Sequence, residues 1–294
     1  MTEPPSAGRV SLPKAIGWSI AFVVLTLLVA SMLGFGIAML IRGSRAGALE
    51  LLASVSAGAM LLQAVVTLLA AGAFTWLIGQ RALRLTLRDL RWVGAGAGGR
   101  GFGWGLLAGA LAAGLTLAIS VAGGDAAWLR DDGTFGQYLG RAALTVAVLA
   151  PAALSEEIIF RGVPLVLLAG SLGRGAAVAA IAIPFALAHL GNPNLTALGV
   201  GNIALAGIFL GLAFYAPGGI WTAWGAHLGW NGLLAALDTP VSGVPFDIPF
   251  LDYRAGGPIW LTGGAFGPEG GLAATAALAV AIPLAARWIG KDPT

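Results

Sequence analysis

The stretch Ser155-Glu156-Glu157-Ile158-Ile159-Phe160-Arg161-Gly162 places two carboxylates and an arginine inside an apolar run that is long enough to cross a bilayer. An ionised group at the centre of a membrane helix costs roughly 2.5–3.5 kcal/mol, so we interpret this cluster as a functional site. Glu157 and Arg161 are four residues apart and share a helix face, whereas Glu156 is turned away by about 100°. We therefore predict that Arg161 holds Glu157 while Glu156 faces a cavity. The alternative is a purely structural ion pair between helices.

The composition of the chain indicates a membrane protein. Hydrophobic residues make up 58% of the 294 residues and charged residues only 10%, whereas about a quarter of a soluble domain is charged. The 46 glycines agree with this class, because glycine lets membrane helices approach one another closely. The absence of cysteine excludes disulfides and thiolate chemistry. The net charge is only +3, and the arginines lie mainly in short connections, so we expect no nucleic-acid partner.

Eight apolar runs predict an all-α, polytopic membrane protein with about eight transmembrane helices. The first run is longer than the apolar core of a signal peptide, about 7–15 residues, so we interpret it as a retained span. The predicted spans are residues 15–41, 51–78, 102–122, 139–169, 176–190, 195–215, 220–237 and 271–289. The single membrane domain, 1–294, then consists of N-terminal spans (1–122), a core (139–237), an extracytoplasmic loop (238–270), and a last span with its tail (271–294).

Several small residues bear on how these spans pack. Gly105 and Gly109 have the G-x-x-x-G spacing that suits a close helix crossing. We expect Pro151 to bend the fourth span. Residues 94–99 spell G-x-G-x-x-G, but no strand precedes them, so we interpret them as a flexible loop rather than a dinucleotide site.

Eight spans place both termini on the same side of the membrane. That side carries ten basic residues and the other side carries five, and the positive-inside rule assigns the more basic side to the cytoplasm. The ten are Arg9, Lys14, Arg81, Arg84, Arg88, Arg91, Arg100, Arg174, Arg287 and Lys291, and the five are Arg42, Arg45, Arg130, Arg141 and Arg254. We therefore predict a multi-pass protein of the cell membrane with both termini in the cytoplasm.

Two further polar clusters lie on other predicted spans. The chain has two histidines, and each shares a helix face with a residue four positions away: Phe185 with His189, and His227 with Asn231. Taken alone, each histidine is more simply explained as a hydrogen-bonded interior residue. Taken together, a carboxylate, two imidazoles and a carboxamide on the inward faces of separate spans predict one shared, hydrated site.

Two kinds of hydrolytic chemistry fit these groups. A metal held by Glu156, His189 and His227 could lower the pKa of a bound water to about 7. Alternatively, Glu156 and His189 could deprotonate water directly, while His227 and Asn231 donate to the developing oxyanion. The residues leave open whether a divalent metal such as zinc is bound or no cofactor is needed.

The ordered pattern E-E-x-x-x-R, F-x-x-x-H and H-x-x-x-N resembles the CPBP family of intramembrane proteases, also called the CAAX-protease and bacteriocin-processing or Abi family. The matching residues are Glu156, Glu157, Arg161, Phe185, His189, His227 and Asn231, and the resemblance covers roughly residues 139–237. It implies hydrolysis of a peptide bond in a membrane-bound or lipidated peptide or protein. It also implies that Glu156 activates water with help from His189, and that His227 and Asn231 serve the oxyanion or a metal.

Two other functions are weighed against a protease. Some bacterial members of the same family look like non-catalytic scaffolds or bacteriocin-immunity proteins. A proton-relaying transporter is a third hypothesis, but it predicts an internal repeat between the halves, and none is apparent. The sequence contains neither H-E-x-x-H nor G-x-S-x-G, so it offers no support for the metalloprotease or serine hydrolase classes with those motifs.

The two histidines lie at different distances along their predicted spans. At about 1.5 Å per residue, His227 lies about 12 Å from the cytoplasmic end of its span, and His189 lies about 21 Å from the start of its own. Straight spans would not bring the two imidazoles level. The fifth run is also shorter than the roughly 20 residues needed to cross. We therefore expect residues 171–175 to dip into the membrane, or the fifth span to be tilted at Pro184.

Overall fold

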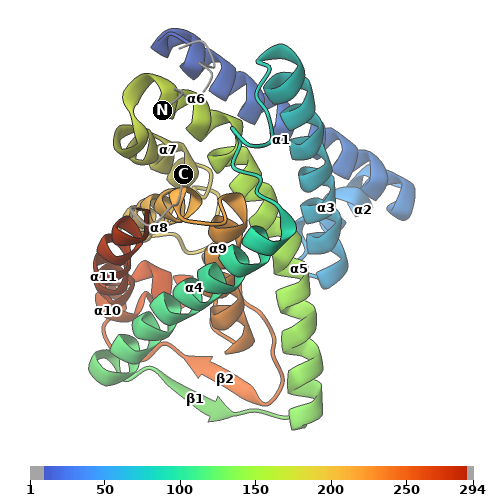
Figure 1. The fold of residues 1–294 in the computed structure, drawn as a ribbon. Coiled ribbons are helices and arrows are strands. Elements are labelled where there is room, and N and C mark those ends of the chain that lie inside the picture. Colours follow the sequence, from blue (N-terminus) through green and yellow to red (C-terminus); the bar gives the residue numbers. More distant parts are fainter. Residues whose placement is uncertain (1–9, 290–294) are drawn as a thin grey trace.

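The fold is a bundle of long apolar helices with almost no sheet (Figure 1). A computed structural model describes residues 10–289. Six helical segments of the described chain are long and apolar enough to cross a membrane, which confirms a multi-pass helical membrane protein. They are α1 (Leu12–Arg42), α3 continued by the π-helix η1 (Ala57–Phe74 and Thr75–Ala82), α4 (Ala95–Gly124), α5 continued by α6 (Phe135–Arg161 and Val163–Leu172), α8 (Ala197–Tyr215) and α11 (Leu272–Ile289).

Two of the eight predicted spans are shorter helices. α7 (Arg174–Leu187) has 14 residues and α9 (Ile220–Ala236) has 17, whereas about 20 are needed to cross the hydrocarbon core. The number of spans and the side of the termini therefore stay predictions. Arg9 and Lys291, two of the basic residues counted for orientation, lie outside the described residues.

Three helix boundaries differ from those predicted. Residues 54–56 divide the second run into α2 (Arg45–Ala53) and α3, and Ser56 caps the first turn of α3. α4 begins at Ala95, so most of the glycine-rich segment 94–99 is helical, and the interpretation as a loop was wrong. The fourth run breaks at Gly162, whereas Pro151 lies within α5. A Cβ atom at position 162 would overlap the carbonyl oxygen of Ile158, so the break requires glycine.

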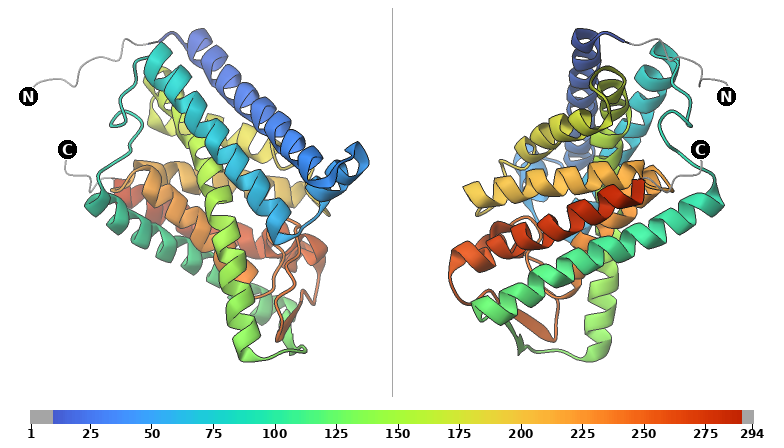
Figure 2. Two further views of the ribbon diagram at one scale, coloured as in Figure 1. Left: turned by 90° about the vertical axis from the view of Figure 1, so that its right-hand side faces the viewer. Right: turned by 60° about the vertical axis from the view of Figure 1, so that its left-hand side comes forward.

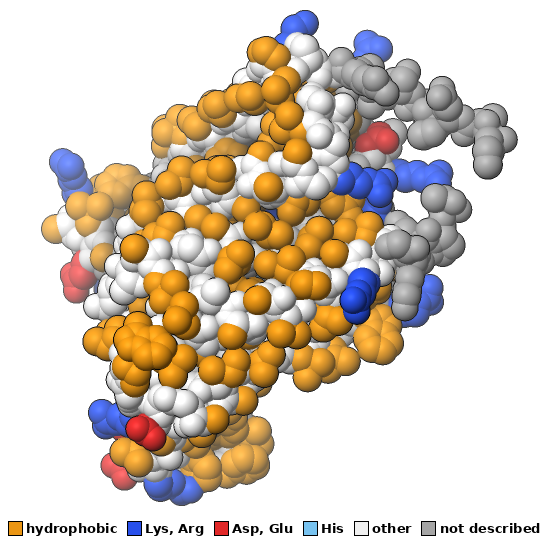
Figure 3. All heavy atoms as spheres, turned by 90° about the vertical axis from the view of Figure 1, so that its left-hand side faces the viewer, with side chains coloured by type: hydrophobic (Ala, Val, Ile, Leu, Met, Phe, Trp, Pro, Cys, Tyr) orange, Lys and Arg blue, Asp and Glu red, His pale blue; other side chains and the backbone are white. Residues whose placement is uncertain are grey.

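The outside of the bundle is apolar. Large hydrophobic side chains such as Met32, Leu40, Leu69 and Trp104 are exposed. Figure 3 shows hydrophobic side chains over the middle of one face, with Lys, Arg, Asp and Glu at its margins. Soluble monomers rarely expose apolar patches larger than a few hundred Å², so this surface fits contact with lipid.

The two ends of the bundle are different. The start of α1 and the end of α11 lie near the connection 83–94, on what we call the terminal side, whereas α2 lies on the opposite, ribbon side (Figure 2). The ribbon side takes its name from β1 (Ala127–Arg130) and β2 (Leu251–Arg254), which pair antiparallel. This ribbon was not predicted. Asp238 accepts hydrogen bonds from the backbone nitrogens of Ile248 and Tyr253, which folds the connection after α9 back over the end of that helix.

That connection also contains three short helical turns before α11 begins. They are α10 (Ile259–Thr262), η2 (Gly264–Phe266) and η3 (Pro268–Gly270). The side chain of Asn202 on α8 donates to the carbonyl oxygens of Glu269 and Gly271, at 2.7 and 2.8 Å. The C-terminal end of the segment 238–270, which was predicted as an extracytoplasmic loop, is thus folded onto α8.

α4 and α9 pack backbone against backbone. A Cβ atom on any of four glycines would overlap a carbonyl oxygen of the facing helix; these are Gly105 and Gly109 on α4, and Gly225 and Gly229 on α9. The close crossing predicted from Gly105 and Gly109 is confirmed, and α9 contributes a second G-x-x-x-G pair that the prediction did not include. This contact fixes the helix that carries His227.

Candidate active site

The last turn of α5 carries a buried ion pair. Arg161 Nη1 lies 3.1 Å from Glu157 Oε1, and both side chains are fully buried. The guanidinium also donates to Gly207 O on α8 at 3.3 Å and lies 4.2 Å from the centre of the Phe185 ring on α7. The pair predicted from the four-residue spacing is therefore present, and it ties α5 to α7 and α8.

Glu157 has a second partner that the sequence did not indicate. Its Oε1 atom lies 2.8 Å from Nδ1 of His227 on α9. A carboxylate beside Nδ1 holds a proton on that nitrogen and so fixes the tautomer of the ring. In the neutral imidazole Nε2 is then an acceptor, and Nε2 is the atom that faces Glu156.

His189 is oriented in the same sense by the backbone. It lies in a turn just beyond the end of α7, with Nδ1 2.8 Å from the carbonyl oxygen of Phe185. A carbonyl oxygen can only accept, so Nδ1 carries the proton and Nε2 accepts in the neutral ring. The Phe185 ring packs against both imidazoles, with centroid distances of 4.9 Å to His189 and 6.2 Å to His227.

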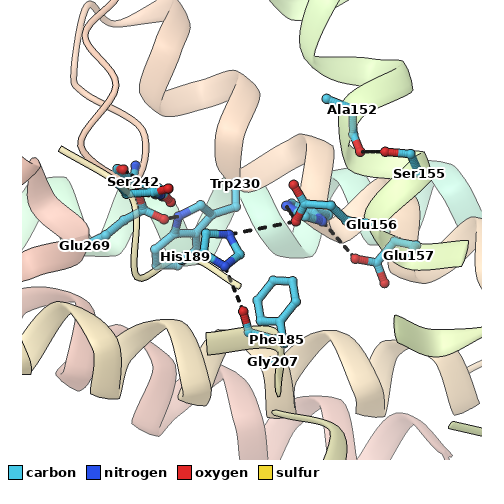
Figure 4. Close-up of polar contacts among 12 residues, drawn as sticks. Ala152, Ser155, Glu156, Glu157, Phe185, His189, Gly207, Trp230, Ser242 and Glu269 are labelled. Carbon is cyan, nitrogen blue, oxygen red and sulfur yellow. Dashed lines mark hydrogen bonds and ion pairs between the residues drawn. The ribbon is translucent and has the colours of Figure 1, made fainter. Parts of the chain in front are cut away.

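Glu156 lies between the two imidazoles, and its approach to His189 is visible in Figure 4. Its Oε2 atom is 3.9 Å from Nε2 of His189 and 3.9 Å from Nε2 of His227. These distances are too long for hydrogen bonds. Oε2 is buried and has no hydrogen-bond partner among residues 10–289, although the side chain as a whole is 34% exposed. Glu157 is thus held by its neighbours, while Glu156 is left free, as the helix geometry predicted.

The two histidines are level with each other, contrary to the count along straight spans. α6 diverges from α5 at Gly162, and α7 follows α6 after the single residue Gly173, whose φ of +81° permits the sharp reversal. This fold brings His189 back to the end of α5. The predicted dip of residues 171–175 or tilt at Pro184 relative to a bilayer stays a prediction.

Three acceptor atoms face one another when both imidazoles are neutral and carry their proton on Nδ1: Glu156 Oε2 and the Nε2 atoms of His189 and His227. Such a set can bind a water molecule or a cation. The donor types of Glu156, His189 and His227 fit a divalent metal such as zinc. Tetrahedral ligand atoms around zinc stand about 3.4 Å apart, whereas Glu156 Oε2 is 3.9 Å from each nitrogen. No group of three His, Asp or Glu side chains in the described chain is arranged to hold a metal ion. The spacing therefore does not fit a metal in this conformation.

The free carboxylate opens into a cleft of about 500 Å³. Its walls come from α1, α3, α5, α9, the turn after α7 and the segment after α9. A smaller chamber of about 30 Å³ lies beyond the imidazoles, and His189, His227 and Asn231 line both spaces. Asn231 makes no side-chain hydrogen bond to another residue of the described chain, so its amide is available to a molecule in the cleft.

Glu269 is a further carboxylate of this region that sequence reasoning missed. It lines the small chamber and accepts hydrogen bonds from Trp230 Nε1 at 2.9 Å, from Ser242 Oγ at 3.2 Å, and from the backbone nitrogen of Ser242 (Figure 4). Burial raises the pKa of this carboxyl, and the donated hydrogen bonds oppose that shift. Its sequence surroundings are rich in glycine and proline and lack helical periodicity, so no local signal distinguished it from a loop residue.

The model of a family described as type II CAAX prenyl endopeptidase Rce1-like matches residues 139–233. These residues form a domain of the Rce1-like family. The Rce1-like range contains all seven residues of the predicted site, from Glu156 to Asn231. No curated protein and no solved structure matches the chain.

The Rce1-like domain coincides with the structural elements that build the site. It runs from the first turns of α5 to the last turn of α9, and so includes the helices that position Glu156, His189 and His227. At the level of the family, this match supports an intramembrane endopeptidase. Glu269 lies outside the matched range.

Proposed function

We propose that this protein is an intramembrane endopeptidase that hydrolyses a peptide bond in a membrane-bound or lipidated substrate, with both termini in the cytoplasm. The observation that carries the proposal is the position of Glu156. Its unpartnered Oε2 faces Nε2 of both histidines at 3.9 Å and opens into a cleft large enough for a peptide. A purely structural ion pair would have no use for a free carboxylate between two oriented imidazoles.

In the proposed reaction, Glu156 acts as the general base. A water in the gap donates one hydrogen toward Glu156 and the other toward Nε2 of His189. Glu156 removes a proton as the oxygen attacks the scissile carbonyl carbon, and it then returns that proton to the amide nitrogen as the C–N bond breaks. Water and amide thus become a carboxylic acid and an amine, with the carboxylate restored.

The remaining site residues serve the oxyanion and the framework. Asn231 donates to the tetrahedral oxygen through its free amide. Glu157 stabilises the imidazolium form of His227, in which Nε2 carries a second proton and donates to the same oxygen. Arg161 holds Glu157, and Phe185 fixes the distance between the two imidazoles.

The test is cleavage by purified full-length protein in detergent micelles. Peptides carrying a lipidated cysteine, and membrane-bound peptides without lipid, are incubated with the wild type, with Glu156→Gln and with the control Glu50→Gln. Glu50 is exposed on α2 and lines neither the cleft nor the small chamber. A general base contributes about 10²–10⁴-fold, so Glu156→Gln should lose at least that factor while its thermal unfolding is unchanged.

Two outcomes decide against parts of the proposal. Full cleavage by Glu156→Gln would remove this residue from the reaction. A cellular function that survives both Glu156→Gln and His227→Ala would instead support a non-catalytic scaffold or bacteriocin-immunity protein. Parallel reactions with and without chelator show whether a metal takes part.

A further inference from the structure

A continuous groove leads from the site along α5. The cleft at Glu156 and a second hollow of about 270 Å³ share three lining residues, which are Met60, Val148 and Phe246. These come from α3, from α5 and from the segment after α9, so both walls and the floor continue from one hollow into the next. We call the combined space the α5 groove.

The α5 groove opens toward the ribbon side. Its outer end is lined by Ser56, Arg141 and Asp247, which are all exposed. Its inner end is closed by Ile159 and Phe160, which are buried in the last turn of α5. No lining residue of the groove belongs to the connection 83–94 or to the ends of α6 and α8 on the terminal side.

We propose that the α5 groove holds an extended peptide segment of the substrate, which enters from the ribbon side. This rests on the proposed peptidase function and adds the direction and length of the substrate. Fifteen positions separate Arg141 from Glu156, which corresponds to about 22 Å along a helix. An extended chain rises about 3.3 Å per residue, so about six or seven substrate residues span the groove.

The chemistry of the walls favours a peptide over a lipid chain. Polar side chains occur along the whole groove and on both sides of it; they are Gln63, Thr67, Thr145, Ser155, Asn192 and Ser242. A peptide shielded from water needs partners for its N–H and C=O groups, whereas an acyl chain needs only apolar contact. At the outer end the Arg141 side chain donates to Asp247 O at 3.1 Å and forms no ion pair within the described chain. It is therefore placed to meet a substrate carboxylate.

The direct test narrows the groove at its neck. Val148→Trp puts an indole where the two hollows join, and Leu139→Trp is the matched control, because Leu139 is exposed on the same helix and lines neither hollow. Both are combined with Glu156→Gln, so that a fluorescent lipidated peptide that the wild type cleaves is bound but not consumed. Val148→Trp should weaken the Kd from fluorescence anisotropy at least tenfold, and Leu139→Trp should leave it unchanged. An unchanged Kd for a folded Val148→Trp protein overturns the groove.

A second measurement does not depend on tolerance of an indole. The chain lacks cysteine, so Ser56→Cys at the outer end and Ala53→Cys on the neighbouring helix are single labelling sites. The peptide should slow maleimide labelling of Ser56→Cys at least fivefold and leave that of Ala53→Cys unchanged. Equal rates with and without peptide, or equal protection of Ser56→Cys by phosphatidylglycerol vesicles alone, would show that no peptide segment occupies this end.

These results separate the groove from the proposed function. If the wild type cleaves and Val148→Trp cleaves with the same KM, the peptidase function is supported and peptide binding in the α5 groove is contradicted. If no peptide is cleaved or bound by any variant, both the peptidase function and peptide binding in the α5 groove are contradicted.

Discussion

Around Glu157 the protein is closed: the carboxylate is fully buried and its Oε1 atom accepts from both Arg161 Nη1 and His227 Nδ1. Around Glu156, the next residue back along the helix, the protein is open: the side chain is 34% exposed and its Oε2 contacts no donor. The same contrast is repeated on α9, whose glycine face is sealed against α4 while His227 and Asn231 line the cleft. The buried contacts of Glu157 and of the α4–α9 crossing, which we call the closed half of the site, thus position His227. The open half, at the cleft, leaves Glu156 Oε2 and the Asn231 amide without a hydrogen-bond partner in the described chain.

The largest effect should come from breaking the closed half. Glu157→Gln leaves Arg161 buried without its counter-charge and removes the carboxylate that orients His227. Loss of one partner of a buried pair costs about 3–5 kcal/mol, so we expect lower thermal stability and loss of cleavage together. Glu156→Gln should lose cleavage alone. Equal stability of the two variants in detergent unfolding would contradict the contrast between the carboxylates.

The close packing of α9 against α4 can be tested by adding one methyl group to a glycine of the contact. Gly225→Ala would place a Cβ atom against the carbonyl oxygen of Phe102, whereas a Cβ at Gly103 on α4 would meet nothing within 4 Å. Overpacking typically costs about 1–3 kcal/mol, so Gly225→Ala should lower the melting temperature and shift His227, reducing cleavage. Gly103→Ala should behave as wild type in both measurements. Matching results for the two alanine variants would show that the crossing is looser than described.

Glu269, which lines the small chamber beside the two histidines, gives a prediction about the pH dependence of stability. Burial raises its pKa above the ordinary value of 4.5, so its contribution to stability is fully present below that value and is lost as pH rises through its folded pKa. Glu269→Leu should cost about 1–3 kcal/mol at low pH, because leucine has no oxygen to accept the hydrogen bonds from Trp230 and Ser242. The difference from wild type should shrink as pH rises above 4.5, because ionisation of Glu269 then destabilises the wild type. Melting curves in detergent across this range provide the measurement, and a constant difference would exclude titration of Glu269 as the cause.

The smallest effect on the protein is expected from an experiment that asks which end of the bundle faces which side of the membrane. Single cysteines at Glu50 on α2 and at Arg84 in the connection 83–94 lie at opposite ends of the bundle (Figure 2). If both termini are cytoplasmic, an impermeant maleimide should label Glu50→Cys in intact cells and Arg84→Cys only after permeabilisation. The reverse pattern would invert the predicted topology while leaving the site geometry untouched.

Much of the fold could be predicted because lipid imposes local rules. Long apolar runs mark helices, and the spacing of Gly105 and Gly109 indicated the α4 contact. The break at Gly162 and the β1–β2 ribbon were not predictable, because they depend on contacts between distant segments. Gly162 is needed only because the backbone there folds back on Ile158, and the strands pair across more than 120 residues of sequence.

Much of the candidate site was also marked in the sequence, since ionisable groups are rare within apolar runs. Spacing indicated the Glu157–Arg161 pair correctly. It could not indicate that Glu157 also contacts His227, because that contact joins two helices 70 residues apart. Glu269 was missed for a related reason: the residues that donate to it, Trp230 and Ser242, come from other parts of the fold.

The equal spacing of Glu156 Oε2 from the two imidazole nitrogens has a consequence for the direction of the chemistry. An oxygen placed symmetrically can shuttle a hydrogen ion between either ring and the reacting centre without rotating its own side chain. Like any catalyst, such a relay would speed the joining of an amine and an acid by the same factor as their separation, so the equilibrium between the peptide and its fragments sets the net direction of the reaction.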